Sequence, residues 1–250
     1  MRLGILGGGR AAWAYGSAWK RIGWPLSGIW LRDESKSHIT ELLGTSRLDL
    51  GDLAASAELL LVAVSDRAVA EVAQAIPETE ALVFHASGAL LSMRDGFSLH
   101  PLKALPPVGQ PSDLADTLLV FEGGHRRTAK LIAAAVGARF AEVAPEQKAR
   151  YHAAAVFGSN YVAAMLEIAE HLLSQAGVNG VREDLVALAH SGIENWRLHT
   201  DQKRFTGPAA RGDREVMGSH VAALQDEPQL AQIYELLAAE LAASILARPK

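Results

Sequence analysis

A glycine-rich turn near the amino terminus separates an apolar run, Arg2–Leu6, from a segment with the spacing of an amphipathic helix. Within the turn, Gly7 and Gly9 combine with Ala12 in a GxGxxA pattern. Between a strand and a helix, this spacing lets backbone N–H groups and the helix N-terminus meet a pyrophosphate. The turn therefore predicts a dinucleotide site formed by Gly7, Gly9, Arg10 and Ala12. The less favoured alternative is a glycine turn needed only for packing.

The rest of the first half alternates short strand-like runs with amphipathic segments. The strand candidates are Arg2–Leu6, Leu26–Leu31, Leu59–Val64, Ala81–His85, Thr117–Phe121 and Arg139–Val143. The helix candidates are Arg10–Ile22, Arg67–Ile76 and His125–Val136. Such alternation is typical of an α/β domain with a doubly wound, mostly parallel sheet. We therefore expect βαβ order throughout a nucleotide-binding domain of residues 1–144.

Beyond residue 144 the pattern becomes helical. The segment Glu146–Ala176 has no proline and one glycine, and its length suits a single continuous helix. Further helix candidates are Arg182–His199, Arg214–Gln225 and Pro228–Ala247. We therefore predict an all-helical second domain over residues 145–250.

Composition limits the classes of partner. Hydrophobic residues make up 49% of the chain, which is enough for a sizeable core. A formal net charge of -4 gives no general attraction for nucleic acid or anionic membranes, and no cysteine is present for disulfides or thiolate metal sites. The chain runs at once into its first strand and has no apolar run of membrane-spanning length. We expect a cytoplasmic protein that acts on a small molecule and binds neither nucleic acid nor membrane.

The end of the second strand bears on cofactor choice. Arg32 lies at the expected strand tip, with Ser35 and Lys36 close by. A basic residue at this position favours the extra phosphate of NADP, whereas an acidic residue would bind the ribose of NAD. Arg32 and Ser35 thus predict NADP, while Asp33 would favour NAD if the strand ran one residue longer. Arg32 also disfavours a methyltransferase, which usually requires an acidic residue there.

Two later strand ends supply further cofactor candidates. Ser65 and Asp66 follow the third strand, and Asp66 either contacts the cofactor or caps the helix after it. Ser87 and Gly88 follow the fourth strand, and the glycine permits close approach of the nicotinamide side of a dinucleotide.

The candidate catalytic residues occur in three polar clusters. His152, Ser159 and Asn160 are about two turns apart on the predicted long helix, and a polar stripe on an apolar helix requires a ligand or a hydrogen-bond network. His100 lies in the second cluster, HPLK, and Arg211 lies in the third, TGPAARGD. The histidines lack paired metal spacing, so we expect no metal site.

Four motifs, HASGAL, SLHPL, YHAAAVFGSNY and TGPAARGD, carry a family resemblance over nearly the whole chain. The chain resembles an uncharacterised bacterial family in which a Rossmann-like domain precedes a helical domain of unknown function. That family is similar to pyrroline-5-carboxylate reductase, ketopantoate reductase and the 6-phosphogluconate and hydroxyisobutyrate dehydrogenases. The resemblance implies NADP or NAD as cofactor and a homodimer formed through the helical domain. Asn160 matches the asparagine of the hydroxyacid enzymes, but Val156 replaces their catalytic lysine.

These observations predict an NAD(P)-dependent oxidoreductase that reduces a C=O or C=N bond of a small carboxylate-bearing substrate. His152 is the expected proton donor, with His100 or Lys103 as the alternatives. Ser159 and Asn160 would orient the substrate, and Arg211 would bind its carboxylate. The alternative from another class is a non-catalytic NADP sensor or assembly module, which the missing lysine favours.

Overall fold

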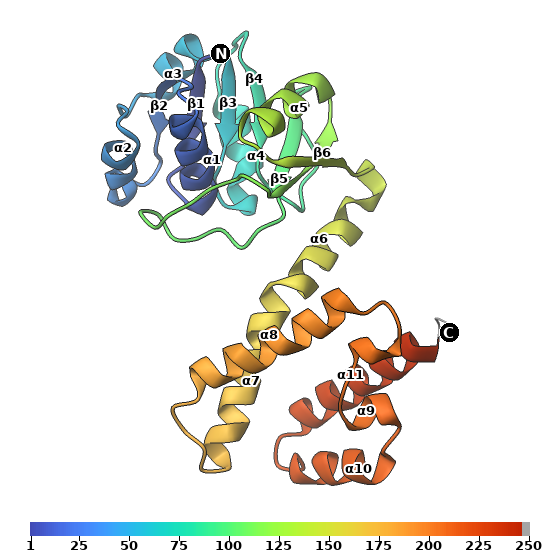
Figure 1. The fold of residues 1–250 in the computed structure, drawn as a ribbon. Coiled ribbons are helices and arrows are strands. Elements are labelled where there is room, and N and C mark those ends of the chain that lie inside the picture. The colour runs from blue at the N-terminus through green and yellow to red at the C-terminus, as the bar shows by residue number, and fades with distance from the viewer. Residues whose placement is uncertain (247–250) are drawn as a thin grey trace. The chain divides into compact units, whose positions relative to one another are not determined.

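The computed structural model describes residues 1–246, so the last residue of the predicted helix Pro228–Ala247 lies outside the described residues. The chain divides into two compact units (Figure 1), one comprising Met1–Val162 and the other beginning at Ala163. This division lies C-terminal to the domain boundary expected at residue 144.

The first unit is built on a seven-stranded sheet with the order β2-β1-β3-β4-β5-β6-β7. Its strands are β1 (Leu3–Leu6), β2 (Leu26–Trp30), β3 (Leu59–Val62), β4 (Leu82–His85), β5 (Phe97–Pro101), β6 (Leu118–Gly123) and β7 (Arg139–Glu142). Every neighbouring pair is parallel except β5 and β6. The predicted mostly parallel α/β sheet is therefore confirmed.

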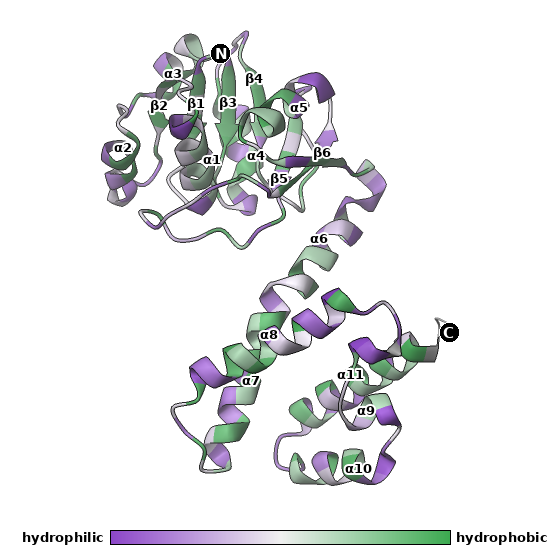
Figure 2. Ribbon diagram, in the orientation of Figure 1, coloured by the Kyte–Doolittle hydropathy of each residue, from purple (hydrophilic) through white to green (hydrophobic). Residues whose placement is uncertain are grey.

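Helices cover both faces of this sheet. They are α1 (Arg10–Arg21), α2 (His38–Leu43), α3 (Leu50–Ser56), α4 (Asp66–Ala75) and α5 (Arg126–Ala135), with α6 (Lys148–Gly158) ending the unit. On α1, Tyr15 and Trp19 are four residues apart and pack with Phe84 of β4 in the larger core cluster. A second cluster lies under α3 and α4, where Leu53 and Val72 are buried. The strands β1, β3 and β4 accordingly consist mostly of hydrophobic residues (Figure 2).

The expectation of βαβ order throughout is wrong at β5, which the sequence analysis missed. No helix joins β4 to β5 or β5 to β6, and β6 reverses the direction of the sheet. The strand is only five residues long and ends in His100 and Pro101, so its polar residues resembled a loop cluster. Its alternation of buried Phe97 and Leu99 with Ser98 and His100 is nevertheless the period of a strand. The short helices α2 and α3 were also missed.

The second unit is helical, as predicted, over the residues that the structure describes. It contains most of α7 (Asn160–Gln175), then α8 (Arg182–Leu198), α9 (Pro208–Arg211), α10 (Arg214–Ala223) and α11 (Pro228–Leu246). A short 3-10 helix, Gln202–Arg204, follows α8. Asp213 caps α10 by accepting a hydrogen bond from the Val216 N–H. Among the described helices, none combines the length and apolar character needed to cross a membrane.

The single helix expected over Glu146–Ala176 is interrupted. After a 3-10 turn at Pro145–Gln147, α6 ends at Gly158, and Ser159 leaves the helical conformation with φ -135° and ψ -71° before α7 begins. Gly and Ser have low helix propensity, and such pairs are common sites of helix kinks.

Gly7 shapes the turn from β1 into α1. Its φ is +122°, a conformation that side chains rarely adopt, and its N–H donates to the Trp30 carbonyl of β2 at 2.9 Å. A Cβ at this position would lie 2.3 Å from the Ala63 carbonyl oxygen, which belongs to the backbone and has little freedom to move. Gly9 differs, because its φ is -95° and a Cβ there would meet nothing within 4 Å.

We expect Gly7→Ala to lower the free energy of unfolding by about 2 kcal/mol or more, because strain at positive φ adds to a backbone clash. Gly9→Ala is the matched control and should change stability by less than about 1 kcal/mol. Urea denaturation followed by circular dichroism measures both. Equal effects of the two substitutions would contradict this account of the turn.

Candidate functional site

The glycine turn leads directly into the N-terminus of α1. Gly9 is the N-cap residue and supplies no side-chain cap, and no acidic residue lies in the first turn of the helix. Backbone N–H groups at such a terminus attract anions. Arg10, the first helical residue, is exposed, and its guanidinium donates to the Leu105 carbonyl at 3.4 Å. Ala12 is fully buried, so it allows close packing of the helix and does not itself present a ligand-binding group.

The segment after β2 places basic side chains beside this turn. Arg32 is exposed and lies 3.4 Å from the Glu71 carboxylate, a weak surface pair. Lys36 packs its aliphatic stem on the turn, since a Cβ on Gly8 would lie 2.9 Å from the Lys36 Cβ. Asp33 instead caps the 3-10 helix Glu34–Lys36, and its carboxylate accepts from both the backbone N–H and the hydroxyl of Ser35. These two hydrogen bonds hold the pKa of Asp33 below its ordinary value.

The residues after β3 are open to solvent at the carboxyl edge of the strand. Ser65 is the N-cap residue of α4 but makes no side-chain cap, and Asp66 is already helical. The capping role considered for Asp66 is therefore wrong, because the helix begins one residue earlier than expected. Ser65 and Asp66 are both exposed, and their contact with a cofactor remains a prediction.

The residues at the end of β4 are largely buried and hydrogen-bonded. His85 Nε2 lies 2.9 Å from the Leu91 carbonyl and its Nδ1 accepts from the Ser87 N–H, so the neutral imidazole is satisfied at both nitrogens. Burial lowers the pKa of His85, which agrees with a neutral structural role. The Ser87 hydroxyl oxygen accepts from the N–H groups of Ala89 and Leu90 and so stabilises the turn that carries Gly88.

A cavity of about 830 Å³ opens between the start of α1, the segment after β5, and α6. All of its lining residues belong to the first unit. The polar ones are Arg10, His100, Lys103, Tyr151, His152, Ser159 and Asn160. Most of the catalytic candidates predicted from the sequence therefore share one cavity with Arg10 of the glycine-turn helix.

His100 on β5 meets two consecutive residues of α6 in this cavity. His100 Nδ1 lies 2.5 Å from the Tyr151 hydroxyl, a short hydrogen bond. The His100 ring centre is 5.7 Å from those of Tyr151 and His152, with both pairs close to perpendicular. His152 Nδ1 is buried and has no hydrogen-bond partner among the described residues.

The absence of a side chain at Gly88 makes room for the imidazole rings of these two histidines. A Cβ on Gly88 would lie 2.5 Å from His152 Nδ1 and 3.0 Å from two carbon atoms of the His100 ring. From the sequence, Gly88 is expected to permit close approach of the cofactor. The close approach that the structure contains is that of the two imidazoles.

Burial determines the protonation states of His100 and Tyr151, the two partners of the short hydrogen bond. Desolvation, followed by the nearby His152 and Lys148, lowers the pKa of His100 to about 4. Desolvation also raises the pKa of Tyr151 to about 12. At neutral pH a neutral imidazole and a protonated phenol therefore share the bond.

Tyr151 is the main functional candidate that sequence reasoning left out. It is adjacent to His152, but the sequence alone did not place His100 on a strand facing α6. Arg211 is exposed at the end of α9, in the second unit, so its proposed contact with substrate remains a prediction. Ser159 and Asn160 line the cavity at the interruption between α6 and α7.

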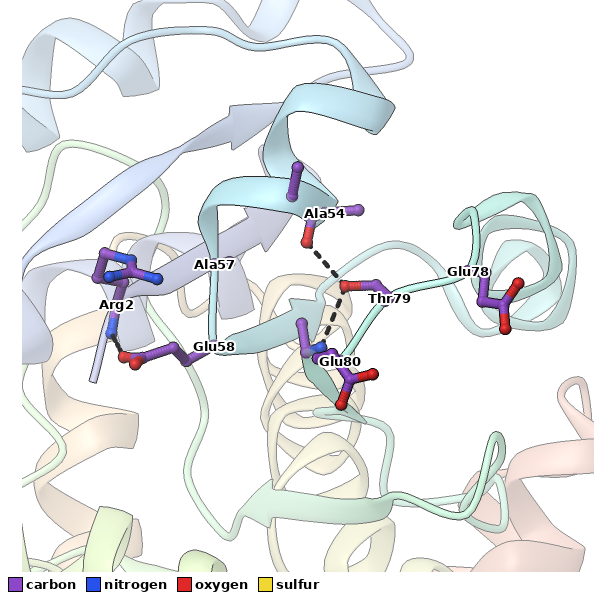
Figure 3. Close-up of a pocket in the computed structure, with 9 residues that line it drawn as sticks. Arg2, Ala54, Ala57, Glu58, Glu78, Thr79 and Glu80 are labelled. Atoms are coloured by element: carbon purple, nitrogen blue, oxygen red, sulfur yellow. Dashed lines mark hydrogen bonds between the residues drawn. The ribbon is translucent and has the colours of Figure 1, made fainter.

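A second cavity, of about 500 Å³, lies at the opposite edge of the sheet, where β1, β3 and β4 begin (Figure 3). Several of its polar groups bond to one another: the Arg2 backbone N–H donates to the Glu58 carboxylate, while the Thr79 hydroxyl donates to the Ala54 carbonyl and accepts from the Ala81 N–H. The Thr79 contacts connect the start of β4 to α3.

Comparison with known proteins identifies both parts of the chain. Residues 1–93 match the family of Rossmann-like domains, and residues 120–241 match the domain of unknown function DUF2520. No curated protein matches the chain in sequence.

Solved structures share the fold over nearly the full length. A protein of Bacteroides fragilis with an inferred NADP oxidoreductase activity is 24% identical, with a TM-score of 0.82 and coverage of 97% of this chain and 98% of that one. A reductive aminase of Aspergillus terreus, solved with NADPH, is 13% identical, with a TM-score of 0.66 and 99% coverage of both chains. The 1-pyrroline-5-carboxylate reductase of Streptococcus pyogenes is 12% identical, with a TM-score of 0.67 and coverage of 97% and 98%.

At these identities the structural similarity establishes the fold, and the cofactors and activities named for those proteins describe them alone. The two family matches agree with the motifs found in the sequence. The chain therefore contains a region that matches Rossmann-like domains, residues 1–93, followed by a region that matches DUF2520, residues 120–241.

Proposed function

We propose that this protein is an NADP-dependent oxidoreductase that reduces a C=O or C=N bond of a small, carboxylate-bearing substrate. One observation carries the proposal: Arg10, at the start of the glycine-turn helix, lines the same cavity as the hydrogen-bonded pair of His100 and Tyr151. A nucleotide-binding turn and a group able to move a proton thus adjoin one space. The fold shared with a reductase and with an NADPH-bound aminase adds support.

The residues present fit a dinucleotide with an extra phosphate. Gly9 leaves open space beside an uncapped helix N-terminus, as pyrophosphate binding requires. Arg32 and Lys36 supply positive charge after β2, while the Asp33 carboxylate is already engaged by Ser35. A carboxylate that is occupied in this way is a poor ribose ligand, so we favour NADP over NAD.

We expect NADPH to bind more tightly than NADH, and Arg32→Ala to weaken NADPH binding by about tenfold or more, because a charged hydrogen bond contributes roughly 1.5–3 kcal/mol. NADH affinity should be unchanged in this variant. Fluorescence titration of the purified protein measures both constants.

Gly9→Ala provides a second arm of this titration, since it should weaken both nucleotides by blocking backbone approach while leaving the fold intact. Failure of the unsubstituted protein to bind either nucleotide would overturn the proposed function. Tight binding with no turnover of any carbonyl or imine acid would support the sensor alternative.

The charge of the cavity favours an anionic substrate. Arg10 and Lys103 line it, and no Asp or Glu is found among the lining residues that the structure describes. The Lys103 ammonium donates to the Asp113 carbonyl at 2.6 Å, which leaves further donors available. Between these cationic groups the wall is apolar, formed by residues such as Leu102 and Val156. A short apolar carboxylate that bears a carbonyl or imine fits this pattern.

When bound, the reduced nicotinamide would supply the hydride. The chain must then deliver a proton to the oxygen or nitrogen of the acceptor. Tyr151 is suited to this step because its raised pKa keeps the phenol protonated and its short bond to His100 fixes the hydroxyl. If His100 donates from Nδ1 to the phenol oxygen, the Tyr151 proton is free for the acceptor, and the bond stabilises the phenolate that forms. His152, the donor expected from the sequence, would orient the acceptor through its unpartnered Nδ1.

We expect Tyr151→Phe to lower kcat by about 10²-fold or more, in the range of general acid catalysis, with NADPH affinity unchanged. His152→Ala should raise KM more than it lowers kcat. Steady-state kinetics on a panel of carbonyl and imine acids separates the two effects. A larger loss of kcat in His152→Ala than in Tyr151→Phe would return the donor role to His152.

We also propose that the protein forms a homodimer through its helical unit. In the described part of this unit, Leu185 and Ala238 are the only buried apolar side chains. Large apolar residues are instead exposed along α8, where Leu188, Trp196 and Leu198 each have 62–67% of their surface accessible. Exposed apolar surface of this extent is typical of an interface between chains.

Leu188→Glu combined with Trp196→Glu should convert the dimer to a monomer, because two charges would be buried without partners. Leu131→Glu, at an exposed leucine on α5 of the first unit, is the control and should leave the dimer intact. Sedimentation velocity distinguishes the species. A monomeric unsubstituted protein would refute the dimer proposal without bearing on the nucleotide site.

A further inference from the structure

A buried lysine joins the start of α6 to the sheet. The Lys148 side chain is 2% exposed, and its ammonium lies 2.9 Å from Glu122 Oε2, whose side chain is 3% exposed. Lys148 also donates a short hydrogen bond to the Ser98 hydroxyl, which in turn donates to Glu122 at 3.0 Å. The same carboxylate accepts from the N–H and hydroxyl of Ser92. Every charge in this cluster is therefore paired, as burial requires.

Apolar packing does not fix α6 in this way. Lys148 is the only fully buried residue of the helix, and Phe157 is 65% exposed. The fully buried contact between α6 and β5 is therefore the Lys148 cluster at one end of the helix. Directional hydrogen bonds specify position more sharply than apolar contacts do, even where they add little net stability.

The cluster and the His100–Tyr151 bond form two successive connections between α6 and β5. On the strand, Ser98 and His100 are two residues apart and share a face, about 6.6 Å from one another along the strand. On the helix, Tyr151 and His152 follow Lys148 by three and four residues, about 4.5–6 Å along the same face. With Lys148 bonded to Ser98, the next turn of the helix lies opposite His100, where Tyr151 makes its hydrogen bond.

We propose that Lys148 is a positioning residue for the reaction site, which it serves by holding α6 in the register that allows Tyr151 to bond to His100. This inference rests on the proposed function for its chemical meaning, because the bond that Lys148 sets is the one assigned to proton delivery. Lys148 itself does not line the cavity, and its ammonium bonds to Ser98 and Glu122.

The test measures the His100–Tyr151 bond directly, without nucleotide or substrate. The ¹⁵N chemical shift of His100 Nδ1, assigned with His100→Asn, is compared before and after Tyr151→Phe in each background. The unsubstituted chain should show a clear change on Tyr151→Phe, because the bond is lost. The Lys148→Met background should show none, because the bond is already absent. Comparison within one background cancels the direct effect of the Lys148 charge, which itself lowers the His100 pKa.

Two further backgrounds separate positioning from general stability. Lys130→Met makes the same substitution at an exposed lysine of α5, and the response to Tyr151→Phe should persist. Lys148→Met combined with Glu122→Gln removes both buried charges, so this variant should fold even if Lys148→Met alone does not. The response should be absent in the double variant too, because the hydrogen bonds that set the register are gone.

A full response to Tyr151→Phe in the folded double variant would overturn the proposal, because Lys148 would then contribute only to stability. NADPH titration of the unsubstituted protein tests the proposed function separately. Absence of nucleotide binding would refute the oxidoreductase while leaving the positioning result to stand on its own.

Discussion

The first unit depends on the conformation of one residue, Gly7. Its N–H bonds to β2, its Cα lies against the carbonyl of Ala63 after β3, and its positive φ directs the chain into α1. The ends of three neighbouring strands thus lie close to Gly7, where no side chain could be accommodated. Because the turn is held so closely, the N-terminus of α1 has a fixed place at the carboxyl edge of the sheet, which is the edge where dinucleotides bind in open α/β folds.

The change from parallel to antiparallel pairing between β5 and β6 determines which polar residues face α6. It places Ser98 and His100 on one face of a strand that lies beside the parallel half, and Glu122 pairs directly with Ser98 across the antiparallel register. The start of α6 then meets that face through Lys148, and Tyr151 follows one turn later. The buried Lys148 cluster and the His100–Tyr151 pair, which faces the cavity, are therefore consecutive contacts between β5 and α6.

The helical unit differs from the first unit in how much of its apolar surface is exposed. Its helices carry large apolar residues on exposed surfaces, and few of its described side chains are buried. Apolar surface left in contact with water contributes nothing to stability, so a unit of this kind gains most from contact with another surface. The proposed homodimer is thus supported by two independent observations, the family resemblance and the exposure of α8.

The sequence by itself determined the α/β class, the glycine turn and the helical second half. It also determined those strands that are β-branched or leucine-rich runs. These features are local, because the period of apolar residues and the positions of glycines define them. Tertiary structure alone decided that the FSLHP strand pairs antiparallel with β6, that Gly88 makes room for His152 and His100, and that Tyr151 bonds to His100. Each of these contacts joins residues from elements that are distant in sequence, and neither spacing nor propensity encodes which strand a helix will face. The same reason explains why Lys148, an ordinary lysine in the sequence, proves to be the most deeply buried charge on α6.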